Sequence, residues 1–85
     1  MPYRVVFSET AIRALDKIHP QHRARIITRA ESLADEPFPP GVKKLRGPEG
    51  WYRIRVGDYR VVYDVQHQRL VVLVVRVSHR RDAYR

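Results

Sequence analysis

The sequence has 85 residues, 44% of them hydrophobic, and 17 Lys and Arg against 9 Asp and Glu give a formal net charge of +8. A chain of this length forms one domain with a modest core, since it buries only about 60–65% of its unfolded surface, and this excludes a large composite active site. It has no cysteine, which excludes disulfides, thiolate metal sites and cysteine nucleophiles. The longest uncharged apolar stretch, Leu70–Val75, is far shorter than the roughly 20 residues that span a bilayer, so we expect a soluble, unprocessed protein.

The first half of the chain predicts one strand followed by two helices. Residues 2–7 are rich in β-branched and aromatic side chains, which indicates a strand. Ser8 suits a helix N-cap and precedes apolar residues at near-helical spacing, which predicts a helix over residues 9–18. Pro20 suits a first helical position and begins a second amphipathic helix over residues 20–35. A Pro-rich cluster then ends the helical region, and residues 42–50 are interpreted as an irregular connector.

The second half predicts three strands. Polar and apolar residues alternate over 51–56, and Gly57-Asp58 forms a two-residue hairpin turn into a strand over 59–65. The run 70–77 is apolar on both faces, as expected of a central strand, and the tail from residue 78 leaves the sheet. The predicted fold is α+β: a two-helix hairpin packed on a mainly antiparallel four-stranded sheet, in the order β-α-α-β-β-β.

The predicted hairpin places three arginines on one face. With a two-residue turn, Arg55 pairs with Arg60, and Arg53 shares their face. The other face is apolar and covers the helices; it comprises Tyr52, Ile54, Val56, Tyr59, Val61 and Tyr63. Like charges opposite each other cost up to about 1 kcal/mol, whereas a bound phosphate would reverse the sign of that contribution. The pattern predicts a phosphate-binding site, although arginines kept for solubility or edge protection remain an alternative.

Positive charge is concentrated in the second half of the chain. Residues 1–42 carry a net charge of +1, and residues 43–85 carry +7. Such an excess indicates a polyanionic partner, either nucleic acid or an acidic protein, and composition does not choose between them. The tail adds a basic and aromatic cluster of the kind that holds an RNA backbone and stacks on a base: His79, Arg80, Arg81, Tyr84 and Arg85.

Three segments together resemble the RelE branch of the RelE/ParE toxin superfamily. They are Lys44-Leu45-Arg46-Gly47, the hairpin from Trp51 to Tyr63 with its G-D-Y-R-V-V-Y core, and the ending from Val75 to Arg85 with the pattern V-x-H-R-x-x-x-Y. The predicted order of elements matches that family over the whole chain. Each segment is short, but their combination and order are specific.

The resemblance implies a cytoplasmic toxin of a type II toxin–antitoxin system that enters the ribosomal A site and cuts mRNA. The family's reaction needs no metal or cofactor: the ribose 2′-hydroxyl attacks the adjacent phosphate, leaving a 2′,3′-cyclic phosphate and a 5′-hydroxyl. By position, Arg60 would bind phosphate, Arg80 would match the arginine after the last strand, and Tyr84 would stack on a substrate base. Further RNA contacts are expected from five basic residues: Lys43, Lys44, Arg46, Arg81 and Arg85.

The sequence departs from the family at two catalytic positions. Arg53 and Arg55 stand where the family has catalytic lysines. Because arginine stays charged, it is a poor general base, and both residues are better interpreted as electrostatic stabilisers of the transition state. His79 is then a candidate base or acid, and the alternative is that it only closes the strand end.

The resemblance also implies partners. These are an acidic, RelB-like antitoxin, the ribosomal A site with its mRNA, and operator DNA only as part of the toxin–antitoxin complex. ParE-type members instead bind DNA gyrase and have no nuclease residues, so gyrase inhibition is the alternative function. His19 and His22 are three residues apart but lack a third ligand nearby, and we expect no metal site.

Overall fold

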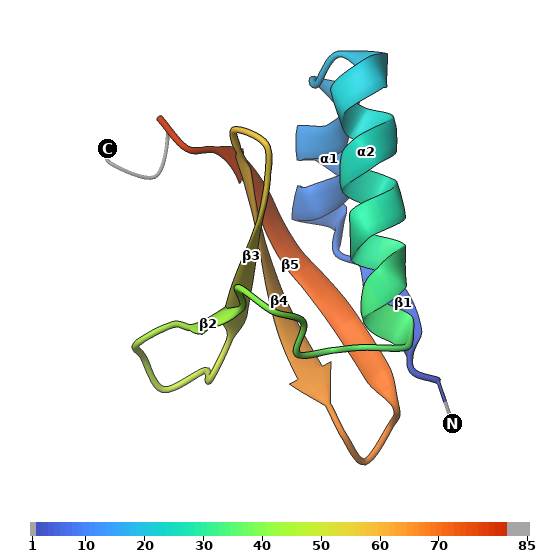
Figure 1. The fold of residues 1–85 in the computed structure, drawn as a ribbon, viewed down its shortest axis with the longest axis vertical. Helices are drawn as coiled ribbons and strands as arrows, with labels where there is room; N and C mark the ends of the chain where they lie inside the picture. Colours follow the sequence, from blue (N-terminus) through green and yellow to red (C-terminus); the bar gives the residue numbers. More distant parts are fainter. Residues whose placement is uncertain (1, 82–85) are drawn as a thin grey trace.

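The computed structural model describes residues 2–81, which form a mixed sheet with two helices packed on one face (Figure 1). The strands lie in the order β1-β5-β4-β3-β2, with β1 parallel to β5 and the other pairs antiparallel. The elements are β1 (Arg4–Phe7), α1 (Glu9–Asp16), α2 (Pro20–Glu31), a 3₁₀ turn (Ser32–Ala34), β2 (Lys43–Lys44), β3 (Tyr52–Val56), β4 (Tyr59–Gln66) and β5 (Val71–His79). The predicted α+β class and the central position of the last strand are confirmed.

Three predicted boundaries are corrected by the structure. The connector contains a fifth strand, because Lys43 and Lys44 pair with β3. The last strand continues to His79 instead of ending at residue 77. The helices are shorter than predicted: α1 ends at Asp16, and the segment after Glu31 tightens into the 3₁₀ turn. No helix within residues 2–81 is both long and apolar enough to cross a membrane.

The hairpin register agrees with the prediction at every pair. Val56 pairs with Tyr59 and Arg55 with Arg60, and Gly57 in the turn has φ of 59°, which suits a primed turn. The apolar face of the hairpin packs on the helices, and its central residues Ile54 and Val61 are buried. Within residues 2–81, no helix covers the opposite face, which we call the open face (Figure 1).

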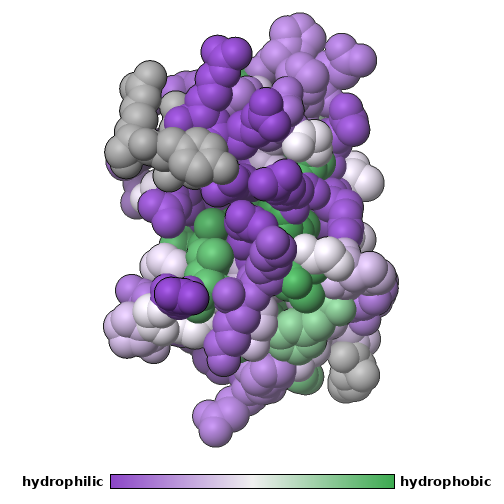
Figure 2. Space-filling model, turned by 60° about the vertical axis from the view of Figure 1, so that its left-hand side comes forward, coloured by the Kyte–Doolittle hydropathy of each residue, from purple (hydrophilic) through white to green (hydrophobic). Residues whose placement is uncertain are grey.

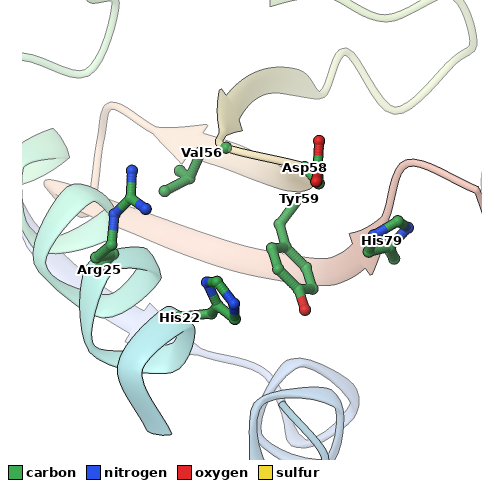
Figure 3. Close-up of a pocket in the computed structure, with 7 residues that line it drawn as sticks. His22, Arg25, Val56, Asp58, Tyr59 and His79 are labelled. Atoms are coloured by element: carbon green, nitrogen blue, oxygen red, sulfur yellow. The ribbon is translucent and has the colours of Figure 1, made fainter. Parts of the chain in front are cut away.

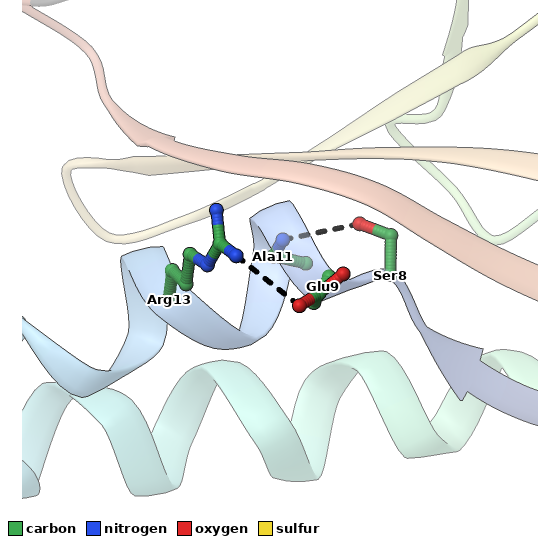
Figure 4. Close-up of polar contacts among 4 residues, drawn as sticks. All are labelled: Ser8, Glu9, Ala11 and Arg13. Carbon is green, nitrogen blue, oxygen red and sulfur yellow. Dashed lines mark hydrogen bonds and ion pairs between the residues drawn. The ribbon is translucent and has the colours of Figure 1, made fainter.

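Ser8 joins the first helix to the sheet (Figure 4). Its side chain accepts a hydrogen bond from the Ala11 N–H over 3.0 Å, which caps α1 as predicted. The same hydroxyl donates to the Val75 carbonyl of β5 over 2.7 Å. One side chain therefore satisfies a free helical N–H and fixes α1 to the central strand.

Replacing Ser8 is expected to destabilise the fold. Ser8→Ala removes both hydrogen bonds and should lower the free energy of unfolding by about 1–2 kcal/mol in chemical denaturation. Arg13→Ala is the matched control, because it removes only an exposed ion pair with Glu9 and should cost at most about 0.5 kcal/mol. A Ser8→Ala protein as stable as the wild type would contradict this double role.

The pairing of β4 with β5 contains a β-bulge. Val62 pairs with Arg76, but the next residue of β4, Tyr63, pairs with Val74. Val75 is therefore an extra residue on β5 with no counterpart on β4. A bulge of this kind reverses the alternation of side chains in the part of the strand that follows it.

The bulge decides which side chains of β5 enter the core. Val74 is fully buried against the helices, and strict alternation would place Arg76 on the same face, two residues later. With the bulge, Val77 enters the core instead, where it is 4% exposed, and Arg76 lies exposed on the open face. The residues after Val77 continue this shifted alternation.

Candidate nucleic-acid interface

Three predicted site residues lie together on the open face. Arg60 of β4 is the direct cross-strand partner of Arg55 on β3. Arg53 pairs with Val62, so it occupies a position diagonal to Arg60. Direct partners have Cβ atoms about 5 Å apart and diagonal partners about 7–8 Å apart, within reach of long side chains. The predicted grouping of these arginines on one face is confirmed.

β5 brings two more arginines to the other side of Arg60. Arg60 pairs with Ser78, which places Arg76 and Arg80 at the two diagonal positions. Pairing continues past the end of β5, because the Arg80 N–H donates to the Asp58 carbonyl over 2.8 Å. The five clustered cations are named the arginine face: Arg53, Arg55, Arg60, Arg76 and Arg80.

Arg60 is one of the two less exposed members of the arginine face; the other is Arg53. Arg60 is half-buried and its Nε atom is buried, whereas Arg55, Arg76 and Arg80 are exposed. A guanidinium held partly out of water interacts more strongly with an anion than one in bulk solvent. Because arginine stays charged, the cluster is strongly positive at neutral pH.

Among residues 2–81, the acidic side chain that forms an ion pair with the arginine face is that of Asp58. The Oδ1 atom of Asp58 is 4.0 Å from Nε of Arg80, and the two side chains are 68% and 61% exposed. An ion pair so long and so solvated contributes little, and it leaves Arg80 able to turn to another anion.

Other basic residues extend the positive surface. Lys43 pairs with Arg53 and so shares its face. A cavity of about 360 Å³ lies beside these residues at the edge of β3, and Arg29 of α2 also lines it. Figure 2, which turns the left-hand side of Figure 1 forward, shows hydrophilic side chains over most of the visible surface, with smaller hydrophobic patches between them.

Of the remaining predicted RNA contacts, Lys44 lies away from the arginine face. Lys44 pairs with Tyr52, and its Nζ atom lies 5.9 Å from the centre of the Tyr52 ring, so it belongs to the opposite face from Arg53. Arg46 and Arg81 are exposed. Tyr84 and Arg85 lie outside the described residues.

His79 lies on the helix-facing side of the sheet. It pairs with Tyr59, and the two rings meet edge to face with centres 5.2 Å apart. Figure 3 shows both residues lining a cavity of about 220 Å³, with His22 and Arg25 of α2 on its other side. The shifted alternation after the bulge separates His79 from Arg60, which lies on the open face.

The hydrogen bonding of His79 also bears on its predicted role. Its Nδ1 atom accepts a hydrogen bond from the Arg81 N–H over 3.2 Å. A neutral imidazole has one acceptor nitrogen, so this contact occupies the lone pair that a general base requires. His79 could take a proton only after breaking that bond. Within residues 2–81, no group of three or more His, Cys, Asp or Glu side chains could hold a metal ion.

Comparison with known proteins decides the family. A family model described as the ParE toxin of type II toxin–antitoxin systems, parDE, matches residues 5–84. The toxin RelG of Mycobacterium tuberculosis is 37% identical over 86 residues, which cover 100% of this chain and 99% of RelG. The chain belongs to the RelE/ParE toxins of type II toxin–antitoxin systems.

Solved structures of related toxins share the fold. The RelBE2 toxin–antitoxin complex of Mycobacterium tuberculosis matches with a TM-score of 0.83 and 34% identity, over 93% of this toxin and 99% of that chain. The archaeal RelE–RelB complex of Pyrococcus horikoshii matches with a TM-score of 0.82 and 33% identity, over 94% and 97% of the two chains. Both relatives were solved with a Rel-type antitoxin.

Arg76 is the member of the arginine face that sequence analysis missed. In the sequence it follows an unbroken apolar run, Leu70–Val75, that is typical of a strand buried on both faces. The charge of Arg76 at the end of that run indicates that its side chain is exposed to solvent. It does not indicate on which face of the sheet the side chain lies. The bulge in this toxin settles the face.

Proposed function

We propose that this toxin is a ribosome-dependent mRNA endonuclease that inhibits translation. The observation that carries the proposal is the arginine face, in which Arg60 has an arginine at one direct and three diagonal positions. Like charges so close together oppose folding, and an RNA phosphate among them converts that repulsion into binding energy. The resemblance to RelE, together with relatives named RelE and RelG, supports mRNA as the source of that phosphate.

In the proposed reaction the ribose 2′-oxygen attacks the adjacent phosphorus. The bond from phosphorus to the 5′-oxygen breaks, the 2′-hydroxyl loses its proton to a base, and the leaving 5′-oxygen gains a proton. The products are a 2′,3′-cyclic phosphate and a 5′-hydroxyl. Arg60 holds the non-bridging oxygens with its bidentate guanidinium, and it is central to the cluster.

The neighbours of Arg60 stabilise the charge that develops in the transition state. Arg55 and Arg53 approach from β3 and Arg80 from the β5 side, and a fixed cation is most effective where negative charge increases. Tyr84 is proposed to stack on a substrate base. We assign His79 no proton transfer, because it lies on the opposite face and its Nδ1 is occupied.

The alternative function is inhibition of DNA gyrase without nuclease activity. Its support is the matching family model, which is described for ParE toxins. In that case the arginine face would be a binding surface without a reacting phosphate.

Cleavage of mRNA on the ribosome separates the two functions. We expect the purified toxin, added to ribosomes with an open A-site codon, to cut within that codon and to leave a 5′-hydroxyl end, mapped by primer extension. Naked mRNA should be cut at least about a hundredfold more slowly, because the ribosome positions the reacting groups. Intact mRNA together with blocked supercoiling in a gyrase reaction would favour the alternative.

The proposed partner that controls the toxin is an acidic, RelB-like antitoxin. Its support is the charge of +8 on this chain and the RelB chains in the related complexes. An acidic, partly disordered segment that folds on binding would neutralise the basic surface. Binding to operator DNA is proposed only for the complex of toxin and antitoxin.

A further inference from the structure

Arg76 reaches the open face only because of the β-bulge. Without the extra residue Val75, alternation would direct Arg76 into the core and Val77 to solvent. Bulges often re-aim a side chain beside a functional site. Here the shift moves an arginine to a position diagonal to Arg60.

The bulge is tied to the rest of the fold by hydrogen bonds. The Ser8 hydroxyl donates to the Val75 carbonyl over 2.7 Å, and the Ser8 N–H donates to the Val74 carbonyl over 2.9 Å. The end of β1 and the start of α1 therefore hold β5 at the irregular position. The backbone beside Arg76 is therefore already ordered, so a ligand that binds Arg76 has only the side chain to order.

The surroundings of Arg76 leave its guanidinium available. Its direct partner on β4 is the apolar Val62, and the two diagonal positions beside Val62 hold Arg60 and Asp64. The Asp64 carboxylate accepts a hydrogen bond from Gln66 over 3.4 Å. Within residues 2–81, Arg76 makes no ion pair or hydrogen bond through its side chain.

We propose that Arg76 binds the RNA phosphate next to the scissile one. This inference rests on the proposed nuclease function: Arg60 on β4 holds the scissile phosphate, and Arg76 on β5 holds its neighbour on the same strand of RNA. The two arginines are diagonal partners, about 7–8 Å apart at Cβ, and both side chains are long enough to adjust to adjacent phosphates. The substrate strand then runs across the sheet toward β5.

A substrate with one neutral linkage tests this subsite. Ribosome complexes are prepared with mRNA that carries a single methylphosphonate on the 5′ or on the 3′ side of the scissile phosphate. For the wild type, one of the two substitutions should lower single-turnover kcat/KM about fivefold to tenfold, the size of one charge-assisted contact. With all-phosphate RNA, the kcat/KM of Arg76→Gln should be lower than that of the wild type by the same factor. The neutral linkage should not lower the kcat/KM of Arg76→Gln any further.

A matched variant controls for the loss of charge. Arg69 is exposed in the turn between β4 and β5, at the end of the hairpin away from Arg80. Arg69→Gln should cleave like the wild type and keep the full sensitivity to the neutral linkage. Three results would contradict the subsite. Arg76→Gln could cleave all-phosphate RNA at the wild-type rate, or the neutral linkage could slow Arg76→Gln as much as it slows the wild type. The third such result is that neither neutral linkage slows cleavage by the wild type.

A binding measurement keeps the subsite separate from the nuclease proposal. Affinity for a short single-stranded RNA with 2′-O-methyl groups, which block the attack, is measured against salt concentration. Arg76→Gln should reduce the slope of log K against log salt by about 0.7, the value for one phosphate contact. An unchanged slope contradicts the subsite. A wild type that leaves mRNA intact contradicts the nuclease proposal, and the slope then still decides whether Arg76 holds a phosphate.

Discussion

Arg60→Ala should abolish mRNA cleavage on the ribosome, with a fall in single-turnover rate of at least about a hundredfold to a thousandfold. Arg60 is the one member of the arginine face that has arginines on both neighbouring strands. Its removal therefore deprives the scissile phosphate of the cation around which the others are placed. Arg55 and Arg80 remain, but each lies at the side of the site.

Three measurements show whether the loss of cleavage comes from the missing guanidinium and not from misfolding or a general loss of charge. Arg60→Lys keeps the charge but not the planar fork, so it should recover only part of the activity. Arg69→Gln, with the same change of charge at an exposed turn, should cleave normally. Far-UV circular dichroism and a cooperative thermal transition should show that Arg60→Ala is folded. Full cleavage by folded Arg60→Ala would remove Arg60 from the mechanism.

Tyr63→Ala should cause the largest loss of stability, about 3–5 kcal/mol in the free energy of unfolding. Tyr63 is the largest of the fully buried side chains and belongs to the core between the sheet and the helices. Its hydroxyl donates to the Pro37 carbonyl over 2.6 Å and so attaches the segment after the helices to β4. Truncation leaves both a cavity and an unsatisfied carbonyl. A loss below about 1 kcal/mol in urea denaturation would contradict this.

Tyr63→Phe separates the hydrogen bond from the packing and adds a pH dependence. Burial raises the pKa of Tyr63 from 10.0 to about 12. Between these values the folded protein keeps a proton that the unfolded chain has lost, so rising pH removes stability, by about 1.4 kcal/mol per pH unit. Phenylalanine has no such proton to lose.

The order of stability of the two proteins should therefore reverse in alkali. Below pH 10, the hydrogen bond to Pro37 should make the wild type more stable than Tyr63→Phe by about 1 kcal/mol. Above about pH 11, the ionisation of Tyr63 in the unfolded chain should make the variant the more stable protein. Urea denaturation of both proteins from pH 8 to pH 12 measures this, and parallel curves would show that Tyr63 is not protected by burial.

The sequence predicted the elements whose signals are local. Ser8 and Pro20 marked the starts of the two helices, because capping and a fixed φ act within one turn. The two-residue turn at Gly57 and the alternation beside it fixed the whole hairpin register, including the pair Arg55 and Arg60. Three of the five members of the arginine face, Arg53, Arg55 and Arg60, followed from these short-range rules.

Contacts between distant segments decided the rest. The two-residue strand at Lys43 forms because the connector meets the edge of β3, and nothing in its own sequence alternates. The bulge at Val75 depends on β4 and Ser8, both remote in sequence, and it alone sends Arg76 to the arginine face and His79 to the other side. The periodicity of a sequence predicts which residues lie on each face of a strand only while the alternation is unbroken. A bulge adds one residue and shifts the alternation. Because contacts with distant parts of the chain decide where this bulge forms, only the tertiary structure reveals it.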